Sequence, residues 1–71
     1  GVSYRAINKT EEPYCFKLSI IKGFNYHSIL KGWVYAPPRS VVKLGGVRIK
    51  NDPGKWSVHP KLKKTRNLDR C

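Results

Sequence analysis

Acidic side chains are scarce in this sequence. Four Asp and Glu oppose fifteen Lys and Arg, which gives a formal net charge of +11 over 71 residues. Glu11 and Glu12 lie near the start, and only Asp52 and Asp69 follow. Uncompensated charge of this density opposes compact folding through self-repulsion. The composition therefore predicts an anionic partner, and it leaves three classes open: sulfated polysaccharide, nucleic acid or an anionic membrane.

Long apolar runs and the patterns of catalytic or metal sites are also missing. No apolar stretch approaches the roughly 18 residues that a membrane-spanning helix needs. The two histidines, His27 and His59, and the two cysteines lack the C-x-x-C or H-x-x-x-H spacing of zinc sites. Nothing orients either imidazole as an acid or a base, and no glycine-rich phosphate loop precedes a helix. We expect no enzyme activity, no cofactor and no metal.

Only two cysteines are present, Cys15 and Cys71. A chain of this length buries a small core and usually needs a cross-link to stabilise its fold. A Cys15–Cys71 disulfide would close nearly the whole chain and stabilise the fold by about 4 kcal/mol through loop-closure entropy. It would also place the protein outside the reducing cytosol. The alternative is two separate thiols, with Cys71 on a frayed tail that links two chains into a dimer.

Two further features point to a secreted, extracellular protein. The chain begins at Gly1 and carries no signal-peptide pattern, which we interpret as a processed mature protein. Asn8-Lys9-Thr10 is an acceptor sequence for N-glycosylation, which has meaning only in a secreted chain. The triplet alone leaves open whether Asn8 carries a glycan.

The apolar pattern divides the chain into an arm and one small domain. Residues 1–14 show no apolar period and are predicted to form a flexible N-terminal arm, with residues 15–71 as the domain. Residues 15–21 alternate apolar and polar side chains, which is typical of a half-buried strand. Residues 29–35 are aromatic and β-branched and predict a second strand.

The rest of the chain predicts a hairpin, a turn and a helix. Gly45-Gly46 lies between two short alternating segments and predicts a two-residue hairpin turn, because both turn positions need positive φ. Residues 51–54 form a strong turn signal. A weakly amphipathic helix is expected from Pro60 onward. The predicted fold is α+β, a small three-stranded antiparallel sheet with a short C-terminal helix, and a small all-β domain is the alternative.

The basic residues fall into two sets. Leu62-Lys63-Lys64-Thr65-Arg66-Asn67 is similar to the XBBXBX pattern of heparin-binding proteins, where B is basic, and Arg66 can make a two-point contact with a sulfate. The second set lies on the predicted hairpin, and the two sets would merge if the tail packs over the sheet edge. The alternative is a solvated tail of like charges. The candidate polyanion-binding residues are Lys43, Arg48, Lys50, Lys61, Lys63, Lys64 and Arg66.

The large aromatic residues have two interpretations. Phe16 and Trp33 are predicted core residues, because the domain has few other large apolar groups. Exposed aromatic rings would instead stack on bases, as in proteins that bind single-stranded nucleic acid.

The order of features over residues 40–64 resembles the chemokine family. Residues 40–44 look like the second strand of that family. Residues 47–53 look like its third strand and the Cys-x-Asp-Pro turn, with Lys50 in the place of the cysteine. Residues 54–58 look like the short lead into the C-terminal helix. Most of the family's cysteines are absent, so the resemblance is to a divergent, chemokine-like protein.

The resemblance implies three antiparallel strands under a C-terminal helix, and a receptor surface that includes Tyr14, Phe16 and Lys17. The predicted function is a secreted cationic signalling protein that binds glycosaminoglycans and a cell-surface receptor. One alternative is a cationic antimicrobial or toxin-like protein that acts on anionic membranes. Another is a module that binds single-stranded nucleic acid.

Overall fold

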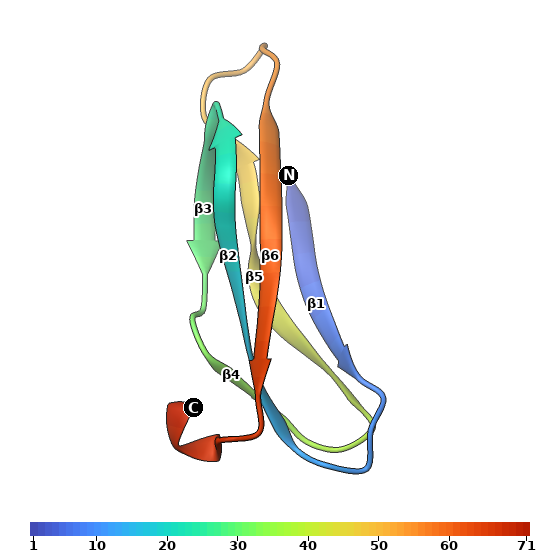
Figure 1. Ribbon diagram of the computed structural model, residues 1–71. Coiled ribbons are helices and arrows are strands. Elements are labelled where there is room, and N and C mark those ends of the chain that lie inside the picture. Colours follow the sequence, from blue (N-terminus) through green and yellow to red (C-terminus); the bar gives the residue numbers. More distant parts are fainter.

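Two three-stranded antiparallel sheets make up the fold in the computed structural model of residues 1–71 (Figure 1). Sheet A has the strand order β1-β5-β3, and sheet B has the order β4-β2-β6. A single turn of 3₁₀ helix, η1, follows the last strand. The elements are β1 (Val2–Asn8), β2 (Tyr14–Phe24), β3 (Tyr26–Leu30), β4 (Val34–Ala36), β5 (Ser40–Ile49), β6 (Ser57–Thr65) and η1 (Leu68–Arg70).

The α+β prediction was wrong, and the all-β alternative fits the structure. The segment expected to be helical forms β6, which pairs with β2 from Thr65 opposite Cys15 to Ser57 opposite Phe24. Few apolar residues were available for a helix to bury, whereas β2 offers a long strand edge that satisfies the backbone of β6. Pro60 is tolerated because β6 is an edge strand. The structure contains no helix with the length and apolarity to cross a bilayer. The fold implied by the chemokine resemblance is therefore not the fold of this chain.

Residues 2–8 form a strand where the sequence analysis expected a flexible arm. β1 pairs with β5 from Val2 opposite Val47 to Asn8 opposite Ser40. Its buried side chains are Ala6 and Asn8, which are small or polar. The sequence therefore shows no apolar alternation, although the strand is built into sheet A.

Gly45-Gly46 is not a hairpin turn but the middle of β5. The register shifts there, because Tyr4 lies opposite Gly45 while Arg5 lies opposite Lys43, which leaves Leu44 as the extra residue of a bulge. Gly45 has φ +113°, and a Cβ atom at this position would lie 2.1 Å from the carbonyl oxygen of Ile29. Glycine is needed here for the bulge and for the close approach of β3.

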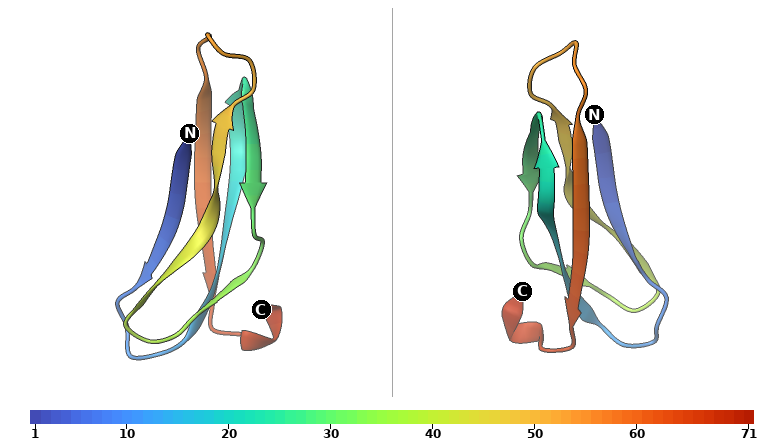
Figure 2. Two further views of the ribbon diagram at one scale, coloured as in Figure 1. Left: turned by 180° about the vertical axis from the view of Figure 1, so that it is seen from behind. Right: turned by 45° about the horizontal axis from the view of Figure 1, so that its top comes forward.

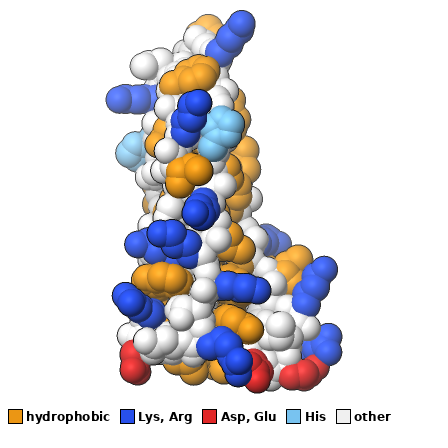
Figure 3. Space-filling model, viewed as in Figure 1, with side chains coloured by type: hydrophobic (Ala, Val, Ile, Leu, Met, Phe, Trp, Pro, Cys, Tyr) orange, Lys and Arg blue, Asp and Glu red, His pale blue; other side chains and the backbone are white.

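The hydrophobic core is small and lies between the two sheets. The molecule is long and narrow, with extents of 43 × 18 × 14 Å (Figures 2 and 3). Phe16 belongs to the core as predicted, whereas Trp33 is only half-buried and lies outside the core cluster. A shape with so little interior depends on additional constraints. The buried core residues that pack together are Ala6, Phe16, Leu18, Ala36 and Leu44.

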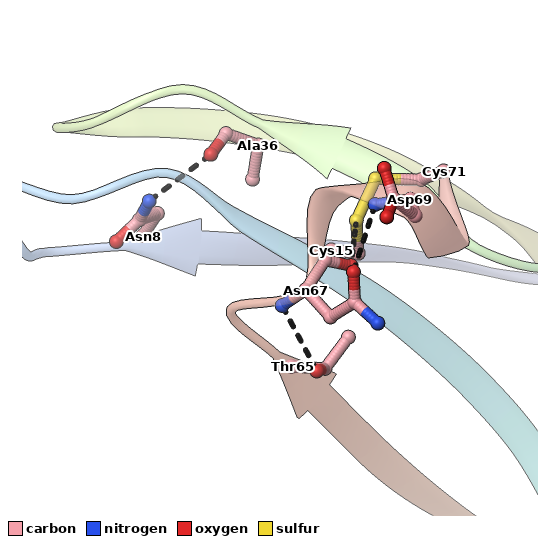
Figure 4. The surroundings of a disulfide bond; sticks show 7 residues. All are labelled: Asn8, Cys15, Ala36, Thr65, Asn67, Asp69 and Cys71. Carbon is pink, nitrogen blue, oxygen red and sulfur yellow. Dashed lines mark hydrogen bonds between the residues drawn. A yellow bond between two sulfur atoms is a disulfide. The ribbon is translucent and has the colours of Figure 1, made fainter.

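The predicted Cys15–Cys71 disulfide is present, and it provides one such constraint. It joins residues 56 positions apart, with Cα atoms 5.9 Å apart, and Cys15 is fully buried. The chain turns back after β6 because the Thr65 hydroxyl oxygen accepts from the Asn67 N–H (3.1 Å) and Asn67 caps η1 (Figure 4). In terms of loop-closure entropy, a bridge of this span stabilises the fold by about 4 kcal/mol.

Asn8 is the second constraint, because its buried amide joins three segments of the chain. The side chain is 2% exposed. Its Nδ2 donates to the carbonyl oxygens of Glu12 (2.8 Å), Ala36 (3.1 Å) and Pro37 (3.0 Å). Its Oδ1 accepts from the N–H (3.0 Å) and the hydroxyl (2.7 Å) of Thr10. The glycosylation triplet thus serves as a structural motif, and a glycan on Nδ2 would displace these hydrogen bonds.

Replacing Asn8 by alanine will destabilise the protein by about 1–3 kcal/mol, because buried carbonyl oxygens lose their donor. The control is Asn51→Ala, which removes an exposed side chain that makes no hydrogen bond in the protein. Urea unfolding of both variants measures the difference. Equal midpoints for the two variants would show that the Asn8 amide does not join these segments.

Candidate polyanion-binding face

Positive charge is neutralised at only one end of the molecule. Glu11 pairs with Arg39 and Glu12 pairs with Arg66, and these are the only ion pairs. Figure 3 shows acidic side chains at the lower end of this view, with Lys and Arg side chains along its length. The remaining cations have no acidic partner within ion-pair distance.

The pairing of β2 with β6 gathers lysines on one face of sheet B. His59, Lys61 and Lys63 alternate along β6 and therefore share a face. The intervening Leu62 lies opposite buried Leu18, so the face with the lysines points away from the core. The register places Lys22, Ser19 and Lys17 opposite these residues, respectively. The β2–β6 face is defined as Lys17, Ser19, Lys22, His59, Lys61 and Lys63.

Two lysines of this face lie directly opposite each other, Lys17 on β2 and Lys63 on β6. Directly opposed side chains in an antiparallel pair have Cβ atoms about 4.5–5.5 Å apart, and like charges in these positions are destabilising. The Lys17 ammonium lies 6.0 Å from the ring centroid of Trp33, a cation–π contact that offsets part of the repulsion. The fold therefore carries an electrostatic cost on this face that a bound anion would remove.

Exposed apolar side chains lie at both ends of the basic row. Tyr35, on β4 opposite Cys15, is 48% exposed and lies at the end where Trp33 contacts Lys17. At the other end Phe24 is 57% exposed, and Ile21, the extra residue of a β2 bulge, is 66% exposed. The face thus has a basic middle and apolar ends.

The structure separates the cations of the XBBXBX segment and Lys61, which precedes it. Lys61 and Lys63 belong to the β2–β6 face. Lys64 points to the other side of β6, where its ammonium lies 5.5 Å from the ring centroid of Tyr14 and it lines the largest hollow, of about 400 Å³. Arg66 follows β6 and pairs with Glu12. Consecutive residues alternate sides in a strand, so the pattern does not form one patch.

The second predicted set lies on sheet A and does not merge with the first. Lys43 and Arg48 are exposed on β5, on either side of its bulge, next to the buried residues Leu44 and Val47. They point outward from sheet A, whereas Lys61 and Lys63 point outward from sheet B. Lys50 lies beyond the end of β5. Lys43 and Arg48 therefore lie on the face of the sandwich opposite to Lys61 and Lys63.

The residues assigned to a receptor surface by resemblance do not form a surface together. Phe16 is 5% exposed and belongs to the core. Tyr14 is half-buried beneath Lys64, and only Lys17 lies on the β2–β6 face. Sequence reasoning missed Lys22 and gave Lys17 a different role. The alternation of residues 15–21 places Lys17 outward, but only the pairing with β6 shows which lysines join it.

His27 and His59 lie in different sheets, and no three His, Cys, Asp or Glu side chains lie close enough together to hold a metal ion.

A scan against protein-family models, a search of curated proteins and a search of solved structures found no match to this chain.

Replacing Lys63 by glutamine will raise the free energy of unfolding by about 0.2–1 kcal/mol at low ionic strength, because it removes the repulsion with Lys17. Lys55→Gln is the matched control, since it removes the same charge from an exposed residue outside the strands. Urea unfolding at low and high salt measures both effects, and salt should shrink the gain. A Lys63 variant that is no more stable than the Lys55 variant would contradict the proposed repulsion.

Proposed function

We propose that this protein is an extracellular polyanion-binding domain that binds sulfated glycosaminoglycans on the β2–β6 face. The observation that carries the proposal is the row of unpaired lysines, with Lys17 and Lys63 directly opposite each other. A ligand that places negative charge between the two ammonium groups would remove this repulsion and so stabilise the fold. The net charge of +11 favours encounter with such a ligand.

The geometry of the face suits a linear ligand with closely spaced charges. Side chains on one face of a strand repeat about every 6.6–6.8 Å, and those on the neighbouring strand lie about 5 Å away. Lys61 and Lys63 form one such step on β6, with Lys17 beside them on β2. A sulfated chain lying along the strands would contact several ammonium groups at once and release its bound counterions.

The Cys15–Cys71 disulfide supports the extracellular part of the proposal, because such bonds persist in oxidising compartments. Trp33 lies beside Lys17, where an aromatic ring can pack on the apolar face of a sugar. The receptor contact implied by the chemokine resemblance is not part of the proposal.

A second candidate function is binding to anionic membrane surfaces. The observation that favours it is the exposed pair Ile21 and Phe24, next to Lys22. Apolar side chains that enter the headgroup region beside lysines add their burial to the attraction for anionic lipids.

Heparin-affinity chromatography tests the proposal with two triple variants of equal charge. Lys17→Gln, Lys61→Gln and Lys63→Gln together will lower the salt concentration at which the protein elutes. The control combines Lys9→Gln, Lys50→Gln and Lys55→Gln, which are exposed residues outside the face. Its elution should shift much less, because none of these lysines lies on the β2–β6 face. Equal shifts would mean that heparin responds to net charge alone and would overturn the assignment to the β2–β6 face.

One further variant, Phe24→Ser, distinguishes the competing ligands. Phe24→Ser should leave heparin elution unchanged. Membrane binding replaces glycosaminoglycan binding as the proposed function under two joint results. Phe24→Ser abolishes sedimentation with phosphatidylglycerol vesicles, and the lysine triple variant keeps its heparin retention. Full competition with heparin by a single-stranded oligonucleotide at physiological ionic strength would favour nucleic acid.

A further inference from the structure

The outer face of sheet A has a hollow of about 240 Å³ that the proposed function does not use. It lies over the β1–β5 bulge. Three cationic side chains line it, one from β1, one from β5 and one from the end of β3. No acidic residue contributes to it. Its lining residues are Ser3, Tyr4, Arg5, Lys31, Lys43 and Gly45.

The bulge builds this hollow. Because Leu44 is the extra residue, the register brings Arg5 directly opposite Lys43, and both point outward next to buried Ala6 and Leu44. Gly45 lets β3 approach the bulge closely, because a Cβ atom at this position would lie 2.1 Å from the carbonyl oxygen of Ile29. The hollow is therefore a consequence of backbone geometry and not of one flexible side chain.

Lys31 is fixed at the rim of the same hollow. Its backbone N–H donates to the carbonyl oxygen of Leu44 (3.1 Å), which ties the end of β3 to the bulge. Three cations thus surround one space, and two of them, Arg5 and Lys43, are cross-strand neighbours of like charge. Both ion pairs of the protein lie elsewhere, so none of the three is neutralised.

We propose that this hollow binds a single sulfate or phosphate monoester group, held by Arg5, Lys31 and Lys43. Arg5 offers a planar fork for two oxygens, and the two ammonium groups supply further charge-assisted hydrogen bonds. The volume admits one tetrahedral group while its ester stem leaves toward solvent. The hollow lies on the sheet opposite to the β2–β6 face, so this oxoanion site is independent of the proposed glycosaminoglycan site.

Titration of the ¹⁵N-labelled protein tests the site. Inorganic phosphate and inorganic sulfate are added at constant ionic strength with chloride as the balancing ion, which holds general screening fixed. Saturable shifts are expected at the amides of Arg5, Lys31, Lys43 and Gly45. Lys43→Gln should weaken binding about tenfold, the loss expected for one charge-assisted hydrogen bond. It also relieves the repulsion with Arg5, so the fold will persist, and Lys55→Gln is the control of equal charge.

Three results decide the outcome. Shifts that never saturate, or equal weakening by Lys43→Gln and Lys55→Gln, would overturn the site. Retention of phosphate binding by the triple variant of the β2–β6 face would show that this site stands even if the proposed function fails. Glucose 6-sulfate and glucose 6-phosphate, compared at equal concentration, show whether a sulfate ester or a phosphate ester is the preferred source of the group.

Discussion

The antiparallel pairing of β2 with β6 is the constraint on which the rest of this account depends. It sets which lysines share a face, because partners across a ladder point the same way. Cys15 and Thr65 lie opposite each other at one end of the ladder, and the chain then turns back so that Cys71 bonds to Cys15. The disulfide therefore holds the end of the strand pair that carries the charge. A core as small as this one would not easily hold two like-charged strands together without it.

That pairing also links stability to function. Backbone hydrogen bonds and the disulfide hold Lys17 against Lys63, and only a cation–π contact with Trp33 reduces the repulsion. No acidic residue pairs with either lysine, and the two ion pairs of the protein are formed by Glu11 and Glu12 with Arg39 and Arg66. Sheet A repeats the arrangement with Arg5 opposite Lys43. Opposed like charges on both outer faces lower the stability of the fold. Binding of the proposed anionic ligands would explain why these charges are placed opposite each other.

Patterns in the sequence predicted some features correctly and failed where distant segments decide the structure; residues 29–35, predicted as one strand, are divided between β3 and β4 in different sheets. The alternation of residues 15–21 predicted a strand, and the short chain with its small core and two cysteines predicted the disulfide. The prediction of a helix from Pro60 was wrong because this segment pairs with β2 instead. That strand lies more than thirty residues earlier, so the pairing leaves no local signal in the sequence. Gly45-Gly46 satisfies the rule for a hairpin and the rule for a bulge equally well, and only the approach of β3 decides between them. The basic residues were found, but their grouping depends on register.

The most direct measurement is a map of backbone amide shifts as a heparin-derived oligosaccharide is added at physiological ionic strength. The largest shifts are expected on both strands and in the same concentration range, at Lys17, Ser19, Lys22, His59, Lys61 and Lys63. Shifts confined to Lys9, Lys50 and Lys55, or no shifts at all, would contradict the claim that the paired strands form the binding surface.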